Sequence, residues 1–173
     1  MYPNYSIWII LVIVFVSANL SFLSERMFAF SPMRVSNEPS SKSSLFYFVR
    51  FLIWLSFFLC AAYLSSNVLL DLPVRVAGLL IMVVCFVIPG IATRKHVQFK
   101  NIFINLYELI FFLIFVGSVG FFIEGYYANS VPLGWQFYAV GICIFLLMAF
   151  PGFVWRHLMN HPHLPKHKLQ QEV

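Results

Sequence analysis

The chain has 173 residues, of which 61% are hydrophobic, 19% are aromatic and only 10% are charged. An ordinary soluble domain carries roughly 25% charged residues, and a core of this size does not bury so much apolar surface, which excludes a water-soluble globular protein. The net charge of +5 does not indicate nucleic-acid binding, because no basic helix face or basic-aromatic loop pattern accompanies it; phospholipid head groups are the expected anionic partners.

Five long apolar runs occupy most of the chain and are separated by short gaps. Each is near the ~20 residues that an α-helix needs to cross ~30 Å of hydrocarbon. The sequence therefore predicts an all-α integral membrane bundle, a single transmembrane domain over residues 1–173 without a separate soluble domain. The five predicted transmembrane helices cover residues 7–23, 46–66, 74–92, 103–124 and 135–155.

The first predicted helix is expected to remain as a membrane span, because a Ser-Glu-Arg sequence follows it and no Ala-x-Ala cleavage signal is present. Its polar residue Asn19 is expected to form hydrogen bonds with other helices. Residues 24–45 come next, are polar and contain Pro32 and Pro39, and are predicted to be a cytoplasmic linker.

The second and third predicted helices resemble the fourth and fifth, as if one helical hairpin occurred twice. Pro89-Gly90 lies near the end of the third helix and Pro151-Gly152 near the end of the fifth, and an Arg follows each Gly by four residues. Since proline removes a backbone N–H and glycine loosens the next turn, a kink or an early helix end is predicted at both pairs. Two interpretations stay open: a duplicated hairpin, or Pro-Gly pairs that recur where helices stop.

Two charged residues fall inside the predicted spans away from their ends, at equivalent positions of the two hairpins. Arg50 is in the second helix and Glu108 in the fourth. Because an ionisable group in hydrocarbon costs ~2.5 to 3.5 kcal/mol on insertion scales, Glu108 is predicted to face another helix or a polar cavity, with Arg50 as its nearest candidate partner. Either side chain can instead extend to the head groups, and a structural role, contact with a partner subunit and a proton or quinone role all stay open.

The fourth helix holds three further features. Asn105 is expected to bond between helices, and the small residues from Gly117 to Gly120 are predicted to form a packing face. Glu124 ends this helix near the level of Arg75, where an exposed ion pair would contribute ~0 to 1 kcal/mol. Trp135 begins the fifth helix at the same membrane surface, where amphipathic aromatic rings suit the head-group layer.

The basic residues predict the orientation, because Lys and Arg are retained on the cytoplasmic side. Ten of the 11 Lys and Arg residues lie in or beside the first and third gaps and the C-terminus, and Arg75 is the exception. The N-terminus is therefore predicted outside and the C-terminus inside. The ten are Arg26, Arg34, Lys42, Arg50, Arg94, Lys95, Lys100, Arg156, Lys166 and Lys168.

No residue pattern indicates a metal site, a cofactor or an enzyme. The three cysteines lie in separate apolar runs, without CxxC spacing. The tail, residues 156–173, is basic and contains four histidines, but Pro162 and Pro165 interrupt the helical spacing that would join His157 and His161 as zinc ligands. No phosphate-binding loop, G-x-S-x-G or H-E-x-x-H motif occurs, so a solvated tail and a non-catalytic protein are expected.

Several segments together resemble a family of small uncharacterised proteobacterial inner-membrane proteins, whose genes commonly end the operon for NADH:quinone oxidoreductase, respiratory complex I. The resemblance covers about the first thirty and the last sixty residues. The segments that carry it are Tyr5-Ser6-Ile7-Trp8-Ile9, Ser17-Ala18-Asn19-Leu20-Ser21-Phe22-Leu23-Ser24-Glu25-Arg26-Met27-Phe28, Tyr107-Glu108-Leu109, Gly117-Ser118-Val119-Gly120, Glu124, Gly134-Trp135-Gln136-Phe137-Tyr138-Ala139-Val140 and Ala149-Phe150-Pro151-Gly152-Phe153-Val154-Trp155-Arg156.

The chain departs from that family, whose usual members resemble a three-helix protein without the segment from about residue 35 to 100. The resemblance puts Glu108, Glu124 and Trp135 in the family motif and leaves Arg50 outside it. It implies a partner rather than a chemical reaction, because no activity is assigned to the family.

The function expected from these observations is that of a non-catalytic accessory or assembly subunit of a respiratory complex in the bacterial inner membrane, most of all complex I. It would bind transmembrane subunits through helix packing and would also contact phospholipids. The alternative is a small transporter or channel with a site near Glu108, because repeats and broken helices occur in transporters. A contribution to a quinone site is a third reading.

Overall fold

The computed structural model describes residues 4–24, 26–32, 43–93, 102–127 and 134–159, and all regular structure in them is helical. Every one of the five helices is long and apolar enough to cross a membrane, which confirms the five predicted spans, and no predicted boundary is displaced by more than three residues. The helices are α1 (Asn4–Leu23), α2 (Ser44–Ser66), α3 (Leu72–Ala92), α4 (Ile102–Tyr127) and α5 (Trp135–Phe153), and a π-helix, η1 (Val154–Leu158), continues from α5.

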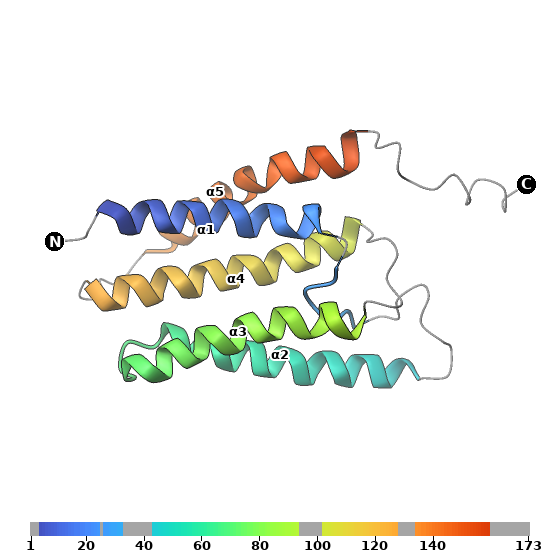
Figure 1. The fold of residues 1–173 in the computed structure, drawn as a ribbon, viewed down its shortest axis with the longest axis horizontal. Helices are drawn as coiled ribbons and strands as arrows, with labels where there is room; N and C mark the ends of the chain where they lie inside the picture. The colour runs from blue at the N-terminus through green and yellow to red at the C-terminus, as the bar shows by residue number, and fades with distance from the viewer. Residues whose placement is uncertain (1–3, 25, 33–42, 94–101, 128–133, 160–173) are drawn as a thin grey trace, which may run out of the picture.

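The helices do not lie in chain order. Figure 1 shows α1 between α5 and α4, and α3 and α2 beyond α4. The first helix packs on both α4 and α5, whereas α2 packs on α3 and α4. The proposed hairpins therefore differ in packing: α2 and α3 lie directly against each other, but α4 and α5 make little direct contact in the described part of the chain, because α1 lies between them.

Alternate helices run in opposite directions, so the described helix ends gather at two ends of the bundle (Figure 1). One end, where α1, α3 and α5 finish, is called here the Glu108 end. The other, where α2 and α4 finish, is called the Glu124 end. Each is named for the carboxyl side chain of α4 that lies nearer to it.

The segment after α1 enters the bundle at the Glu108 end. Met27 is 1% exposed and Ala29 is 0% exposed, and the ring of Phe28 contacts that of Phe112 with centroids 5.2 Å apart. Figure 1 shows this segment descending from α1 toward α3. The start of the predicted linker, residues 24–45, is thus buried where its residues are apolar, and residues 25 and 33–42 lie outside the described part.

An aromatic cluster joins α2, α3 and α4. The ring of Trp54 lies 4.8 Å from that of Phe111, and the rings of Phe86 and Phe112 are stacked at 4.6 Å between centroids. Phe58, which is 0% exposed, contacts both Phe86 and Phe111 in edge-to-face geometry. Such ring pairs contribute ~0.5 to 1.5 kcal/mol beyond their buried area. The cluster holds the second and third helices on the fourth.

The closest approach of α2 and α3 depends on Gly78. A Cβ added at this position would lie 2.8 Å from the carbonyl oxygen of Ala61 and 2.9 Å from the backbone nitrogen of Ser65. Both atoms belong to the α2 backbone, so the two helices must separate to accommodate a methyl group.

A Gly78→Ala variant is therefore expected to lose about 1–3 kcal/mol of unfolding free energy, the usual cost of overpacking. The loss is measured by titrating the detergent-solubilised protein with dodecyl sulfate and following its helicity. Gly117→Ala is the matched control, because no heavy atom lies within 4 Å of its added Cβ. Equal stability of the two variants would contradict the assignment.

Candidate functional site

The Glu108 carboxyl lies at the junction of α4, α1 and the buried segment after α1. Its residue is 0% exposed. One oxygen accepts a hydrogen bond from the backbone N–H of Phe28 at 2.7 Å, and the other lies 3.0 Å from the hydroxyl of Ser21, which donates to it. Glu108 thus has the inward geometry expected of an ionisable residue in a span, and it fastens the segment after α1 to α4.

Arg50 lies on α2 near the same end of the bundle. Its guanidinium carbon is 4.5 Å from the ring centroid of Phe30 and 5.1 Å from that of Tyr47, which is cation–π geometry. Phe30 belongs to the buried segment after α1. These contacts connect Arg50 to the same segment that Glu108 holds, and a direct pairing of Arg50 with Glu108 stays a prediction.

Asn105 lies one turn before Glu108 and is also 0% exposed. Its side-chain Nδ2 is 3.4 Å from Nε2 of His157 in η1, and its backbone carbonyl oxygen is 3.2 Å from the Ser21 hydroxyl. The structure therefore places Asn105 between α4, α1 and η1, which is the interhelical position expected for it. Glu108, Asn105, Ser21 and His157 form one polar cluster, called here the Glu108 cluster.

The Pro151-Gly152 pair of α5 is met by Asn19 of α1. The Oδ1 of Asn19 accepts a hydrogen bond from the backbone N–H of Gly152 at 2.7 Å, and its Nδ2 donates to the carbonyl oxygen of Met148 at 2.8 Å. In an uninterrupted α-helix, the N–H of residue 152 would bond to the carbonyl oxygen of residue 148, four residues earlier. The side-chain amide of Asn19 bonds to both of these backbone groups of α5. A Cβ on Gly152 would lie 2.7 Å from that Oδ1, so glycine is needed for this approach.

The Pro89-Gly90 pair of α3 is met by Trp54 of α2. Proline has no N–H, which frees the carbonyl four residues earlier, that of Cys85. The indole N–H of Trp54 donates to this carbonyl oxygen at 2.9 Å. Gly90 faces the segment after α1, where an added Cβ would lie 3.1 Å from the carbonyl oxygen of Met27.

Of the two outcomes predicted at the Pro-Gly pairs, the early end is not observed, because neither helix ends at its proline, and a kink stays a prediction. The third helix continues through Pro89 to Ala92, and the fifth continues through Pro151 to Phe153 before η1 begins. Backbone groups near each proline find donors or acceptors on neighbouring helices, which is how proline is accommodated inside a membrane. The position of the freed carbonyl follows from sequence, but Trp54 as its donor does not.

Arg75 occupies the Glu124 end and was expected at the surface, paired with Glu124. It is instead 4% exposed, and its Nη2 donates to the carbonyl oxygens of Phe122 at 3.0 Å and Phe121 at 3.4 Å. A Cβ on Gly125 would lie 2.8 Å from that Nη2, so the missing side chain makes room for the guanidinium. The predicted surface ion pair is wrong, because Arg75 is buried and its guanidinium donates to backbone carbonyl oxygens of α4 and α2.

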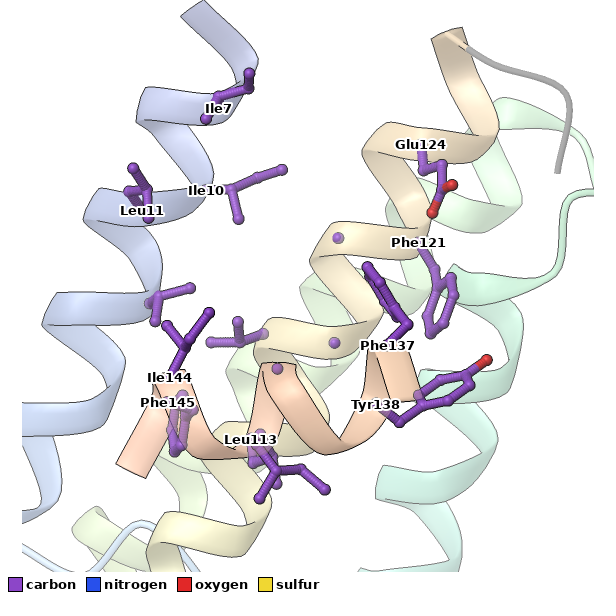
Figure 2. Close-up of a pocket in the computed structure, with 16 residues that line it drawn as sticks. Ile7, Ile10, Leu11, Leu113, Phe121, Glu124, Phe137, Tyr138, Ile144 and Phe145 are labelled. Carbon is purple, nitrogen blue, oxygen red and sulfur yellow. The ribbon is translucent and has the colours of Figure 1, made fainter. Parts of the chain in front are cut away.

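A cleft lies between α1, α4 and α5 in the half of the bundle toward the Glu124 end. Its volume is about 670 Å³, and Figure 2 shows side chains of all three helices around it. No heavy atom lies within 4 Å of a Cβ added at Gly117, Gly120 or Gly141. The predicted packing face from Gly117 to Gly120 therefore forms part of a cleft wall, and Glu124 lies at one end of the cleft.

Metal ligands do not gather in the described residues, where no group of three or more His, Cys, Asp or Glu is present. The histidine-rich part of the predicted tail, residues 160–173, lies outside the described part of the chain. Trp135, another predicted contact residue, begins α5 and is 74% exposed, so its ring is available to the surroundings of the bundle.

Residues 68–160 match a family of proteins of unknown function, DUF2818, and this segment covers α3, α4 and α5. The chain belongs to that family. The match includes α3, which the sequence resemblance had placed outside the family pattern, and leaves out α1. No curated protein and no solved structure was found to match the chain.

The matched segment contains most of the candidate residues, and the Asn105 contact with His157 lies within it, but other contacts reach residues outside it. Glu108, Asn105 and both Pro-Gly pairs lie inside it. Their partners Ser21, Asn19 and Trp54 lie before residue 68. The helices outside the match therefore supply the polar groups that complete those inside it.

Proposed function

We propose that this multi-pass membrane protein is a non-catalytic accessory or assembly subunit of a respiratory complex in the bacterial inner membrane, with NADH:quinone oxidoreductase as the first candidate. It binds other transmembrane subunits through helix packing. The proposal includes the orientation given by the basic residues, with the N-terminus outside and the C-terminus inside. It also includes the origin of the two hairpins by duplication.

The observation that carries the proposal is that the polar side chains lie inside the bundle and large apolar side chains lie on its outside. The intramembrane polar residues Glu108, Asn105 and Asn19 turn inward and bond to other parts of the chain. The outward faces carry large apolar side chains instead. Such a bundle is suited to holding its own shape and to presenting apolar faces to neighbouring helices, whose association depends on shape because hydrocarbon provides little hydrophobic driving force.

The fifth helix supplies the preferred contact face. Leu147 is 73% exposed and Phe150 is 61% exposed, and both lie within the residues matched by the family. Phe57 and Tyr63 of α2 are similarly exposed, at 63% and 66%, but precede the matched segment. If binding is a property of the family, the contact face lies within the matched segment, and the α5 face is the one that we propose.

We expect the tagged protein, extracted in mild detergent from bacteria that carry its gene, to co-purify with respiratory subunits detected by mass spectrometry. The double variant Leu147→Ala with Phe150→Ala should lower their recovery about tenfold, because truncated anchor residues commonly cost more than 1 kcal/mol each. The matched control, Phe57→Ala with Tyr63→Ala, should retain them. A monodisperse protein free of respiratory subunits would contradict the proposal.

A small transporter or channel is the second candidate, and the Glu108 cluster favours it. A wholly buried carboxyl within hydrogen-bonding distance of Ser21, near Asn105 and His157, is the kind of intramembrane group found on ion and proton pathways. Against it, the cluster lies near one end of the bundle rather than at its middle, where transporter sites are typically found. The monodisperse outcome of the purification would favour this candidate.

A further inference from the structure

The cleft between α1, α4 and α5 has a length of about half the membrane thickness. On α4 it reaches from Leu113 to Glu124, and on α5 from Phe137 to Phe145. The eleven residue-to-residue rises from Leu113 to Glu124, at ~1.5 Å each, correspond to ~16 Å, close to half of a ~30 Å hydrocarbon layer. Beyond this region the cleft closes, because α1 and α5 approach each other at the Asn19 contact with Gly152.

The cleft is apolar along its length and polar at one end. Its lining is almost entirely aliphatic, aromatic or glycine, while the carboxyl of Glu124 lies near the end of α4 (Figure 2). Beside this end, the hydroxyls of Tyr5 and Tyr127 are 3.3 Å apart, and tyrosines are typical of the head-group layer. Ile7, at 51% exposed, and Ile142, at 43%, leave the cleft open to the surroundings. It therefore has the polarity of one membrane leaflet, with the polar end at the surface.

We propose that this cleft binds one phospholipid of the leaflet at the Glu124 end, with an acyl chain along Gly117, Gly120 and Gly141. A volume of about 670 Å³ is in the range of small-molecule sites. A transmembrane helix of a partner is ~10 Å wide and continues through both leaflets, so a cleft that closes halfway does not suit it. A flexible chain that ends near the bilayer middle does.

The charges around the cleft select the head group. Glu124 lies at its polar end, and no Lys or Arg among the described residues lines it. The Lys or Arg that the described residues place at this end of the bundle is Arg75, which is buried and bonded to the carbonyl oxygens of Phe121 and Phe122. The guanidinium of Arg75 thus lies beside α4 but outside the cleft lining, whose charge among the described residues is that of the Glu124 carboxylate. A negative lining attracts an ammonium and repels a net anionic head group. The preferred ligand is a zwitterionic lipid with a primary ammonium, as in phosphatidylethanolamine.

The test uses the purified, delipidated full chain and native mass spectrometry, with phosphatidylethanolamine and phosphatidylglycerol supplied at equal concentration. We expect one retained lipid per chain and a preference for phosphatidylethanolamine of about tenfold, as one close charge interaction near a protein surface can provide. Glu124→Gln should retain the lipid but lose this preference. Equal retention of the two lipids by the unchanged chain would overturn the head-group assignment.

The double variant Gly120→Leu with Gly141→Leu fills the cleft and should reduce lipid retention at least tenfold, without unfolding, because both positions face open space. Ala77→Leu, at an exposed position of α3, is the matched control and should retain the lipid. Unchanged retention by the glycine variant would overturn the site. So would crosslinking of a Gly141→Cys variant to a helix of another protein in native membranes. Because retention is measured on the isolated chain, its failure is distinct from a failure of the proposed respiratory association.

Discussion

Replacement of Asn19 by leucine is expected to lower the unfolding free energy by about 1–3 kcal/mol. Two interhelical hydrogen bonds are lost, and each contributes ~0.6 to 1.7 kcal/mol inside a membrane. They are the bonds to the backbone N–H of Gly152 and to the carbonyl oxygen of Met148. The measurement is dodecyl sulfate titration of the detergent-solubilised protein, with Val12→Leu as the control because that side chain is 60% exposed on the same helix.

A double-mutant cycle separates the Asn19 contact from a general loss of packing. Gly152→Ala should also destabilise, because its Cβ would lie 2.7 Å from the Asn19 Oδ1. Combining it with Asn19→Ala removes the clash and the bond together, so the double variant should lose less than the sum of the two single losses. Additive losses would contradict a direct contact between the two residues.

The second large effect is expected at Glu108. Glu108→Leu removes the acceptor of the Phe28 N–H and of the Ser21 hydroxyl and should cost about 2–4 kcal/mol, since two hydrogen bonds to a buried carboxyl are lost. Glu108→Gln retains an acceptor oxygen and should lose less than half as much. The control is Glu124→Leu, the same substitution on the same helix at a residue that lies on the cleft wall.

Proteolysis distinguishes this role of Glu108 from a purely local packing effect. The carboxyl holds the segment after α1, so Glu108→Leu should release it and expose the bond after Arg26 to trypsin. Peptide mapping reports cleavage at Arg26 separately from cleavage elsewhere. If Glu108→Leu were as stable as the unchanged protein, or if cleavage at Arg26 did not increase, the segment would not depend on Glu108.

Within the Glu108 cluster, the sequence predicted the right residue types but few of their contacts. The free-energy cost of placing ionisable and amide groups in hydrocarbon indicated that Glu108 and Asn105 face inward. The contact of Glu108 with the Phe28 N–H was not predicted, because residues 24–45 were interpreted as a polar linker. Every residue except proline has a backbone N–H, so the sequence does not indicate which one acts as the donor. Arg75 was missed for a similar reason, because its partners are backbone carbonyls.

The lengths of the apolar runs by themselves determined the helical fold of the described residues, with five helices able to cross a membrane, because about 20 residues of helix span hydrocarbon whatever their neighbours are. The spatial order of the helices was decided only by tertiary structure. Each helix carries apolar residues on all of its sides, so no narrow apolar stripe in the sequence identifies the face that packs against other helices. The contacts that select the order join positions far apart in the chain, such as Asn19 with Gly152 and Trp54 with Cys85. They depend on which helix brings a side chain within 3 Å of a backbone group near each proline.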